Sequence, residues 1–489
     1  MDSVSSHGAE WGGRRGPGRG LRTSRLHRAV LSKCARCASI LLVFAAATHG
    51  ADDINLITLD PGHFHAALFQ REMLPGVSPE VFVYAPLGPE LAAHVQRVAQ
   101  FNLRSENPTH WQLEIRTDPD PLARMLAERR GNVVVLSGNN RQKMDRIEAI
   151  VRAGLNVLAD KPWIIEPDAF SKLQAALDVA DQRRVIAYDA MTERFDISCL
   201  LQRELVSDRD VFGEPLQGTP DEPAVRLESL HYLMKEVAGA PNLRPVWFFD
   251  IRQQGEGLAD VGTHLIERAQ WTLFPEAAID HRREVVVLRA ARWPTVLDRA
   301  QFRRVTGAGE FPDFLREAVK DNQLEYFCNN SVLYTLRGIH VKAVVQWEFE
   351  APPGSKDSVL AVFRGSKSRL EARQGRAEQF RPELFVIPNR EADRATVRQA
   401  LGRKIETLQK SFPGVAWEEQ PAGIHILVPD ALRTGHETHF AQVCRRFLEY
   451  VRNPGSLPAW EKPNMLAKYY VTTKGIELAR ESKLEPSIP

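Results

Sequence analysis

The chain has 489 residues, more than one ordinary hydrophobic core accommodates, so we expect at least two domains. Its 43% hydrophobic and 26% charged residues are typical of a globular protein. The formal net charge of +2 conceals an uneven distribution, because residues 1–50 hold eight of the 64 Lys/Arg and two of the 62 Asp/Glu. The rest of the chain is therefore slightly acidic, which excludes an electrostatic case for nucleic-acid binding.

Residues 1–50 have the three-part pattern of a secretory signal. A basic stretch ends at Arg36, an apolar run follows over 38–47, and small residues lead to Gly50-Ala51. The apolar run is too short to span a bilayer. The alternative is a basic tail beside an isolated apolar patch. We expect an exported protein, periplasmic or extracellular, with no membrane span.

Strands and helices alternate along residues 51–190. The pattern predicts strands at 54–59, 81–84, 112–116, 132–136, 156–159 and 185–188, and helices at 66–73, 89–101, 121–130, 141–153 and 167–181. This alternation is typical of βαβ units with a parallel sheet. We therefore predict an α/β fold whose N-terminal part, 51–190, is a dinucleotide-binding Rossmann domain.

The character of the sequence changes after residue 190. Long alternating segments at 284–290, 331–349 and 358–372 predict a mostly antiparallel sheet, with a further strand pair at 416–418 and 423–428. Helices are expected at 195–206, 395–411, 437–451 and 464–482. Residues 191–489 are thus predicted to form an α+β domain with a large open sheet for substrate binding and oligomerisation, closed by helices within 390–489.

The turn after the first strand is the place where a Rossmann domain seats a pyrophosphate. Here it reads Asp60-Pro61-Gly62-His63-Phe64-His65, with Asp60 and His65 at the first and third glycine positions of the usual fingerprint. Gly62, His63, Phe64 and His65 are candidate cofactor contacts. The second strand is followed by no acidic residue that would contact a ribose, so the choice between NAD and NADP stays open.

The histidines of this turn have several interpretations. His63 and His65 could contact substrate, contact phosphate or simply pack. We predict no metal ion there, because we expect the two side chains to point to different sides and no cluster of carboxylates completes a ligand set. The cysteines outside the leader, Cys199, Cys328 and Cys444, are too widely spaced for a zinc site or a disulfide framework.

Two later turns follow buried strands of the predicted parallel sheet. Asn139-Asn140 lies at the carboxyl end of strand 132–136, where ligands bind in such sheets. Asp160-Lys161-Pro162 follows strand 156–159 and offers a lysine that could donate to the cofactor or to a substrate hydroxyl. The alternative is a surface lysine paired with Asp160.

A glycine-rich helix carries the third motif. Asp260 and His264 are spaced i, i+4, which places them on one helical face, and an Asp that orients a His makes an acid–base pair. A capping Asp with a core His is the structural alternative.

These pieces in this order resemble the glucose–fructose oxidoreductase / inositol dehydrogenase (Gfo/Idh/MocA) family. The resemblance covers residues 54–275 by motif, with Asp160 in place of the Glu of the family's Glu-Lys-Pro turn. It implies that Lys161, Asp260 and His264 are catalytic, and that Gly62, Asn140 and the Asp160-Lys161 turn contact NAD or NADP. It also implies a sugar-like substrate and a homo-oligomer.

Candidate substrate contacts follow from position near the predicted cleft between the domains: Thr192, Arg194, Lys235, Arg244 and Trp247. Three functions remain open. The first is NAD(P)-dependent hydride transfer to or from a sugar, polyol or glycoside. The second is redox-neutral glycoside cleavage with tightly held NAD, which export favours because free cofactor is scarce outside the cytosol. The third is a non-catalytic secreted sugar-binding protein.

Overall fold

The computed structural model describes residues 53–237, 240–241 and 243–482, and the predicted secretory signal lies outside these ranges. No helix in the described part of the chain is long and apolar enough to cross a membrane.

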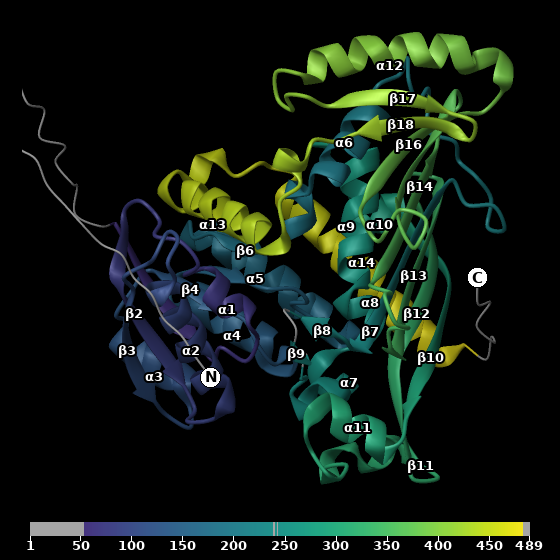
Figure 1. Cartoon of the computed structure of the whole chain (residues 1–489). Helices are drawn as coiled ribbons and strands as arrows, with labels where there is room; N and C mark the ends of the chain where they lie inside the picture. The colour runs from purple at the N-terminus through teal and green to yellow at the C-terminus, as the bar shows by residue number, and fades with distance from the viewer. Residues whose placement is uncertain (1–52, 238–239, 242, 483–489) are drawn as a thin grey trace, which may run out of the picture. The chain divides into compact units, whose positions relative to one another are not determined.

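The first sheet has six parallel strands in the order β3-β2-β1-β4-β5-β6, which confirms the predicted Rossmann topology (Figure 1). The strands are β1 (Ile54–Leu59), β2 (Val77–Ala85), β3 (Gln112–Thr117), β4 (Val133–Leu136), β5 (Asn156–Ala159) and β6 (Ala187–Asp189). The helices are α1 (His65–Leu68), α2 (Pro89–Leu103), α3 (Pro121–Glu128), α4 (Lys143–Arg152) and α5 (Phe170–Arg183). The strand order changes direction between β1 and β4, so their carboxyl ends form the crevice in which such sheets bind ligands.

The second sheet is large and mostly antiparallel, as predicted, with one parallel pair, β13 and β7. Its order is β10-β12-β13-β7-β14-β15-β16-β18-β17, and β11 (Val319–Lys320) pairs with β12. The strands are β7 (Val225–Met234), β10 (Val285–Leu297), β12 (Gln323–Leu336), β13 (Ile339–Glu350), β14 (Ser358–Arg364), β15 (Ser368–Gln374), β16 (Glu383–Pro388), β17 (Ala416–Gln420) and β18 (Gly423–Leu427). A two-stranded sheet joins β8 (Glu236–Val237) and β9 (Ala240–Pro241).

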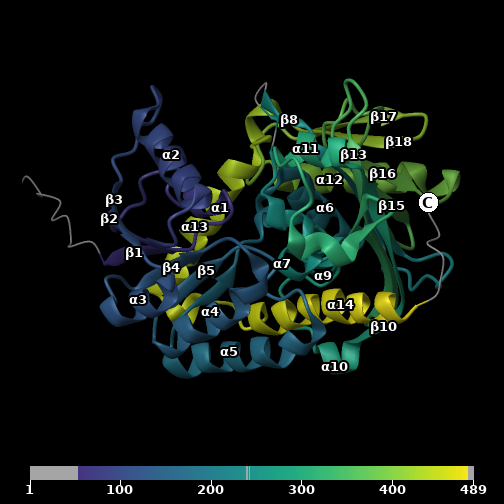
Figure 2. The ribbon, with the colours of Figure 1, turned by 90° about the horizontal axis from the view of Figure 1, so that it is seen from below.

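Helices cover one face of this sheet and connect it to the first (Figure 2). They are α6 (Ile197–Val206), α7 (Ile251–Gln254), α8 (Gly257–Asp260), α9 (Gly262–Leu273), α10 (His281–Glu284), α11 (Arg299–Thr306), α12 (Arg394–Leu408), α13 (His436–Arg452) and α14 (Glu461–Glu481). Phe440 and Phe447 of α13 pack into the Rossmann core, and Tyr469 of α14 does the same on the other face of that sheet. The last helices therefore belong as much to the Rossmann core as to the 191–489 segment in which the sequence places them.

Three predicted elements differ in the structure. The helix expected at 66–73 ends at Leu68, because the chain turns through Pro75 and Gly76 (φ 70°) into β2. The helix expected around Asp260 and His264 is two helices, α8 and α9, that meet at Val261. The long strand expected at 331–349 is a hairpin, because Arg337 (φ 52°) and Gly338 (φ 80°) take the two left-handed conformations of a tight turn.

Candidate active site

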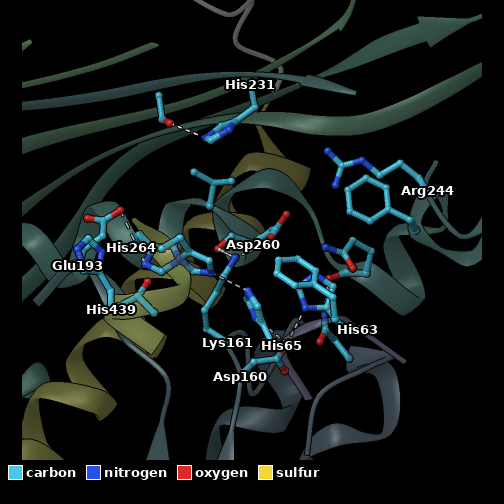
Figure 3. Close-up of a pocket in the computed structure, with 18 of the residues that line it drawn as sticks. His63, His65, Asp160, Lys161, Glu193, His231, Arg244, Asp260, His264 and His439 are labelled. Carbon is cyan, nitrogen blue, oxygen red and sulfur yellow. Dashed lines mark hydrogen bonds and ion pairs between the residues drawn. The ribbon is translucent and has the colours of Figure 1, made fainter. Parts of the chain in front are cut away.

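A cavity of about 1250 Å³ extends from the carboxyl ends of β1, β4 and β5 to the wall formed by β7 and β13. Small-molecule sites usually enclose about 300–1000 Å³, so this cavity has room for a cofactor and a second ligand together. Gly62, Gly138 and Lys161 line the cavity from the Rossmann domain, and His231 and Trp347 line it from β7 and β13. Figure 3 shows Lys161 and His231 on opposite sides of it.

Lys161 lies directly after β5 and reaches into the cavity. Its Nζ is 2.5 Å from Asp260 Oδ1 and donates to the Asp260 carbonyl oxygen at 3.1 Å. Both side chains are largely buried, at 11% and 14% exposure. Burial acts to raise the pKa of Asp260, but the Lys161 ammonium outweighs it and the pKa lies below its ordinary value. The site therefore holds an ionised pair, and the surface lysine alternative is wrong.

His264 does not form the predicted pair with Asp260, because Asp260 is engaged by Lys161. Its nearest carboxylate is Glu193, whose Oε1 lies 3.9 Å from His264 Nδ1, and this nitrogen is buried with no hydrogen-bond partner among the described residues. Burial, reinforced by the Lys161 charge, lowers the pKa of His264 well below its ordinary value. Burial raises the pKa of Glu193. The imidazole is thus neutral near pH 7.

Asp160 joins the turn after β5 to the turn after β1. Its Oδ1 lies 2.5 Å from Lys143 Nζ, and its Oδ2 accepts from Ser137 Oγ at 2.8 Å. The same Oδ2 lies 3.2 Å from His63 Nδ1 and 3.3 Å from His65 Nδ1. Burial acts to raise the pKa of Asp160, but the Lys143 charge outweighs it and holds that pKa well below its ordinary value. Asp160 therefore pairs with Lys143, not with Lys161 as the sequence allowed.

The two histidines of the β1 turn converge, contrary to the expectation that they point to different sides. Ligand atoms of His63, His65 and Asp160 lie within 4.8 Å of one another, a spacing that a metal ion could bridge. The Lys143 ammonium already neutralises the single carboxylate of this group. The charge of a divalent ion would therefore remain uncompensated in a buried place, which gives the cluster poor charge balance for a cation.

The β1 turn keeps a tight shape despite its missing glycines. Asp60 takes the left-handed conformation (φ 44°), which aspartate tolerates better than most residues, and its carboxylate pairs with Arg146. A Cβ on Gly62 would lie 3.0 Å from Gly138 Cα, so the turns after β1 and β4 pack backbone against backbone.

The cavity continues past this turn to α2. It passes Phe64 and reaches Glu90 and Arg97, whose guanidinium lies 5.5 Å from the centre of the Phe64 ring. No ion pair within the described residues includes Arg97, which leaves a cation at the end of the cavity. The position of this channel and the cation at its end fit a dinucleotide that lies across the carboxyl ends of the strands.

Some predicted contact residues line the cavity and others do not. Asn140 lines it while its side chain donates to the Gln254 carbonyl oxygen, and Thr192, Arg244 and Trp247 line it as well. Asn139 lies outside the lining and donates to Gln253 Oε1 at 2.6 Å. Of the predicted pair, Asn139 therefore forms an interdomain hydrogen bond, and Asn140 alone lines the cavity.

Arg194 and Lys235 form internal ion pairs and do not line the cavity. Arg194 lies 2.7 Å from both Glu267 and Glu461 and is largely buried. Lys235 Nζ lies 2.6 Å from Asp357 Oδ2. Neither is among the lining residues, and the role of these two as substrate contacts stays a prediction.

The sequence did not predict several residues that line the cavity or support its wall. His231 and Ser229 alternate along β7 and face the cavity together, a period-of-two signal that the sequence did contain. Lys143 occupies a core position of α4 in register with Ile147 and Ile150, and a charged residue at such a position signals a buried partner. His436, at the start of α13, lies 3.0 Å from His65 Nε2 and had no local signal.

Comparison with known proteins agrees with this architecture. A model of the "Putative oxidoreductase C terminal domain" family matches residues 201–480. A crystal structure described as a putative oxidoreductase from Parabacteroides merdae is 43% identical, with a TM-score of 0.86 over 89% of this chain and 99% of that one. No curated protein matches the sequence significantly.

More distant structures share the fold alone. Levoglucosan dehydrogenase in complex with NADH and levoglucosan is 14% identical, with a TM-score of 0.54 over 87% of this chain and 97% of that one. KijD10, a 3-ketoreductase from Actinomadura kijaniata in complex with NADP, is 13% identical, with a TM-score of 0.53 over 87% and 97%.

Fold and site together define an oxidoreductase built from a Rossmann domain and an open sheet. The chain belongs to the family of the matched C-terminal oxidoreductase domain, in agreement with the resemblance to Gfo/Idh/MocA enzymes.

Proposed function

We propose that the protein transfers hydride between NAD or NADP and a hydroxyl-bearing carbon of a sugar, polyol or glycoside. The observation that carries this proposal is the buried Lys161–Asp260 pair beside His264, at the junction of the Rossmann turn with the second half of the cavity. Membership of an oxidoreductase family disfavours the non-catalytic alternative. The distant dehydrogenase and ketoreductase structures, with NADH and NADP respectively, support either cofactor.

The residues that would hold the cofactor lie along the channel from α2 to β5. They are Gly62, His63, Phe64, His65, Asn140, Lys161 and, at the far end, Arg97. The nicotinamide, when bound, supplies the hydride acceptor or donor. Phe64 is 40% exposed and offers an apolar surface with a cation behind it. The Arg97 guanidinium would pair with a phosphate of the cofactor.

Proton movement would fall to the residues at the junction. His264 is neutral and lines the cavity, and its Nδ1 is buried beside Glu193, so Nε2 is the ring nitrogen that would take the proton of the hydroxyl that is oxidised. The Lys161 ammonium, fixed by Asp260, would stabilise the negative charge that develops on that oxygen. In the reverse direction the His264 imidazolium returns the proton to the carbonyl oxygen. Asp260 holds the lysine in place through its carboxylate and its carbonyl oxygen.

The sheet wall would hold the sugar. Trp347 and Trp247 line the cavity, and aromatic faces with nearby charges are the usual setting for sugar rings. Arg244 lies over Phe248 and Trp347, with its guanidinium carbon 4.9 and 5.3 Å from the two ring centres. This stacking orients a cation toward sugar hydroxyls.

A ligand analysis tests the cofactor part of this proposal. Purified protein is denatured, and the released small molecules are identified by mass spectrometry. In parallel, cofactor-stripped protein is titrated with NADH and NADPH while tryptophan-sensitised nicotinamide fluorescence is followed. We expect a released nicotinamide nucleotide or saturable binding of one form. Neither release nor binding in wild-type protein would contradict the proposal.

Export and self-association are further parts of the proposal. The basic and apolar pattern of residues 1–50 supports export, and cell fractionation with N-terminal sequencing of the mature protein tests it. On the second sheet, Val286, Leu288 and Val296 of β10 are exposed, which favours a homo-oligomer through this strand. Light scattering on wild type and Val286→Glu tests that interface. If the two proteins have the same molar mass in solution, the interface is contradicted.

A further inference from the structure

Arg244 presents a guanidinium to the cavity from the side of the second sheet. The guanidinium carbon lies over Phe248 and Trp347, 4.9 and 5.3 Å from the two ring centres. Figure 3 shows the guanidinium pointing into the space between His231 and Asp260. Contacts with two aromatic rings hold a cation in place without neutralising its charge. The fold therefore fixes the direction of this side chain before any ligand binds.

Most hydrogen-bond donors of Arg244 are unused. Its backbone N–H donates to the Val305 carbonyl oxygen at 2.8 Å, and Nε lies 3.4 Å from the Leu233 carbonyl oxygen. Within the ranges that the structure describes, neither Nη1 nor Nη2 has a hydrogen-bond or ion-pair partner. The side chain is half-buried and lines the cavity, so the two nitrogens are open to a ligand there.

The ion pairs around Arg244 leave its charge without a counterion. Burial lowers the pKa of Arg244, and the charges of Asp260 and Asp357 offset part of this effect. Each of these carboxylates already has a lysine, since Asp260 lies 2.5 Å from Lys161 and Asp357 lies 2.6 Å from Lys235. Two carboxylates and two ammonium groups cancel, so one positive charge, that of Arg244, is left over.

The sheet register keeps Asp357 engaged on the sheet. Ser358 of β14 pairs with Leu230 of β7, which places Asp357 beside His231. His231 Nδ1 lies 2.9 Å from Asp357 Oδ2, and Asp357 is not among the residues that line the cavity. A ligand at this end of the cavity therefore meets the charge of Arg244 and not that of Asp357.

We infer that the substrate is an acidic sugar, a uronic acid or its glycoside, whose carboxylate binds Arg244. The inference rests on the proposed function, because it takes the reacting hydroxyl of the same sugar to lie at Lys161 and His264. A planar carboxylate matches the guanidinium fork and accepts two parallel hydrogen bonds from it. It also supplies the negative charge that balances Arg244, which neutral hydroxyl groups cannot do.

A phosphate is the competing anion. It carries about two negative charges near pH 7, and several cations or a helix N-terminus usually hold it. The described residues that line this end of the cavity, 243–248, 306 and 347, hold no second arginine or lysine. The ionised Asp260 also lies close enough to act on Arg244. A ligand with a single negative charge therefore fits better than a phosphate.

Pairs of sugars that differ only at carbon 6 test this inference. Full-length protein is titrated by calorimetry with methyl glucuronide and methyl glucoside, and with methyl galacturonide and methyl galactoside. Nicotinamide reduction gives kcat/KM for the same four sugars. We expect the acidic member of at least one pair to bind about 10–100-fold more tightly and to have the higher kcat/KM, because a hydrogen-bonded ion pair has this strength.

Matched variants assign the preference to one guanidinium. Arg244→Met keeps an apolar stem and removes the charge, so it should abolish the preference for the acidic sugar. Arg244→Lys should restore part of it. Arg304 is the control, because it also lies over an aromatic ring, Phe349 at 5.3 Å, but pairs with Glu350 at 3.0 Å and is outside the cavity lining. Arg304→Gln should keep the wild-type preference. Thermal melting checks the fold of each variant.

Three outcomes would overturn the inference. In the first, neither uronide binds wild-type protein more tightly than its neutral partner. In the second, Arg244→Met retains the preference of wild type. In the third, methyl glucoside 6-sulfate binds wild type more tightly than both uronides, which would make the subsite one for sulfate esters. Nicotinamide reduction by the neutral sugars alone would also overturn it and would leave the proposed function standing. A uronide that binds through Arg244 without reducing nicotinamide would instead contradict the proposed function alone.

Discussion

The turns after β1 and β5 differ in how they depart from the patterns expected of a dinucleotide-binding enzyme. The β1 turn has lost two of its glycines, yet keeps its tight course because Asp60 adopts the left-handed conformation. The β5 turn keeps its lysine but has Asp160 where the resembling family has glutamate. Asp160 contacts His63 and His65 of the first turn and Lys143 of α4. The two departures are therefore physically linked, and one buried carboxylate holds both turns together.

The comparison also separates two kinds of lysine. Lys143 is 1% exposed and lies behind Asp160, whereas Lys161 opens on the cavity beside Asp260. The first stabilises the turn and the second acts on ligands. Substitutions at the two positions should therefore affect different measurements.

The largest effect is expected from Lys161→Met. Loss of the ammonium removes stabilisation of charge on the reacting oxygen, so turnover should fall about 10²–10⁴-fold. Nicotinamide turnover with a sugar and glycoside panel measures it, and thermal melting checks the fold. Lys172→Met is the matched control, because Lys172 pairs with Asp145 at the surface of the Rossmann domain. Equal activity of both variants would contradict the assignment.

Asp160→Ala should affect stability more than any other change at the two turns. It leaves the Lys143 ammonium buried and unpaired, at a cost of about 3–5 kcal/mol of unfolding free energy. Denaturant unfolding measures it. The double variant Asp160→Ala/Lys143→Met removes both charges and should recover much of the loss. Additive effects of the two single substitutions would show that the pair is not coupled.

Stability should fall on acidification through a histidine near the cofactor channel. Burial lowers the pKa of His94 to about 4, and neither ring nitrogen has a hydrogen-bond partner within the described residues. Because its folded pKa is below the unfolded value of about 6.5, this group stabilises above pH 6.5 and loses its contribution as the pH falls toward 4, by about 1.4 kcal/mol per pH unit.

His94→Leu should make the unfolding free energy depend less steeply on pH, because about one proton fewer is taken up on unfolding. Unfolding free energies between pH 7 and 4.5 provide the slope. His110, which is exposed, supplies the control variant His110→Leu. A slope that stays the same in His94→Leu would mean that His94 binds its proton equally well in the folded state.

The smallest effect is expected at Asp60. Its left-handed backbone penalises residues with an ordinary Cβ, so Asp60→Ala should be about 1–2 kcal/mol less stable than Asp60→Gly. Both variants lose the Arg146 ion pair, so their difference isolates the conformational cost. Thermal melting of the two proteins side by side gives this difference. Equal stability would show that the turn has relaxed in the variants.

The sequence predicts the fold well because its signals are local. Alternation of strands and helices up to residue 190 identifies the parallel sheet, and the longer alternating strands afterwards identify the antiparallel one. Lys161 is found for the same reason, since it directly follows a buried strand. The sequence does not predict that α13 and α14 return to the Rossmann core, because Phe447 and Tyr469 reach it only through tertiary packing.

The sequence could not predict which side chains of the site pair with one another. Asp260 and His264 share a spacing that predicts a pair, but Lys161 arrives from a segment 99 residues away and takes the carboxylate. Arg194 has the position of a substrate contact, yet two distant glutamates bind it first. Asp357 joins His231 through the register of two strands that are far apart in the chain. Such competition depends on distances that no local pattern contains.

The most direct test of the central claim follows the hydride itself. Sugars and glycosides deuterated at their ring carbons are incubated with protein carrying nicotinamide, and the nucleotide is then released and weighed by mass spectrometry. Hydride transfer predicts reduced nicotinamide with one deuterium for a substrate in wild type, and little label in Lys161→Met at the same incubation time. Conversion of the sugar with no deuterium in the nicotinamide would contradict it.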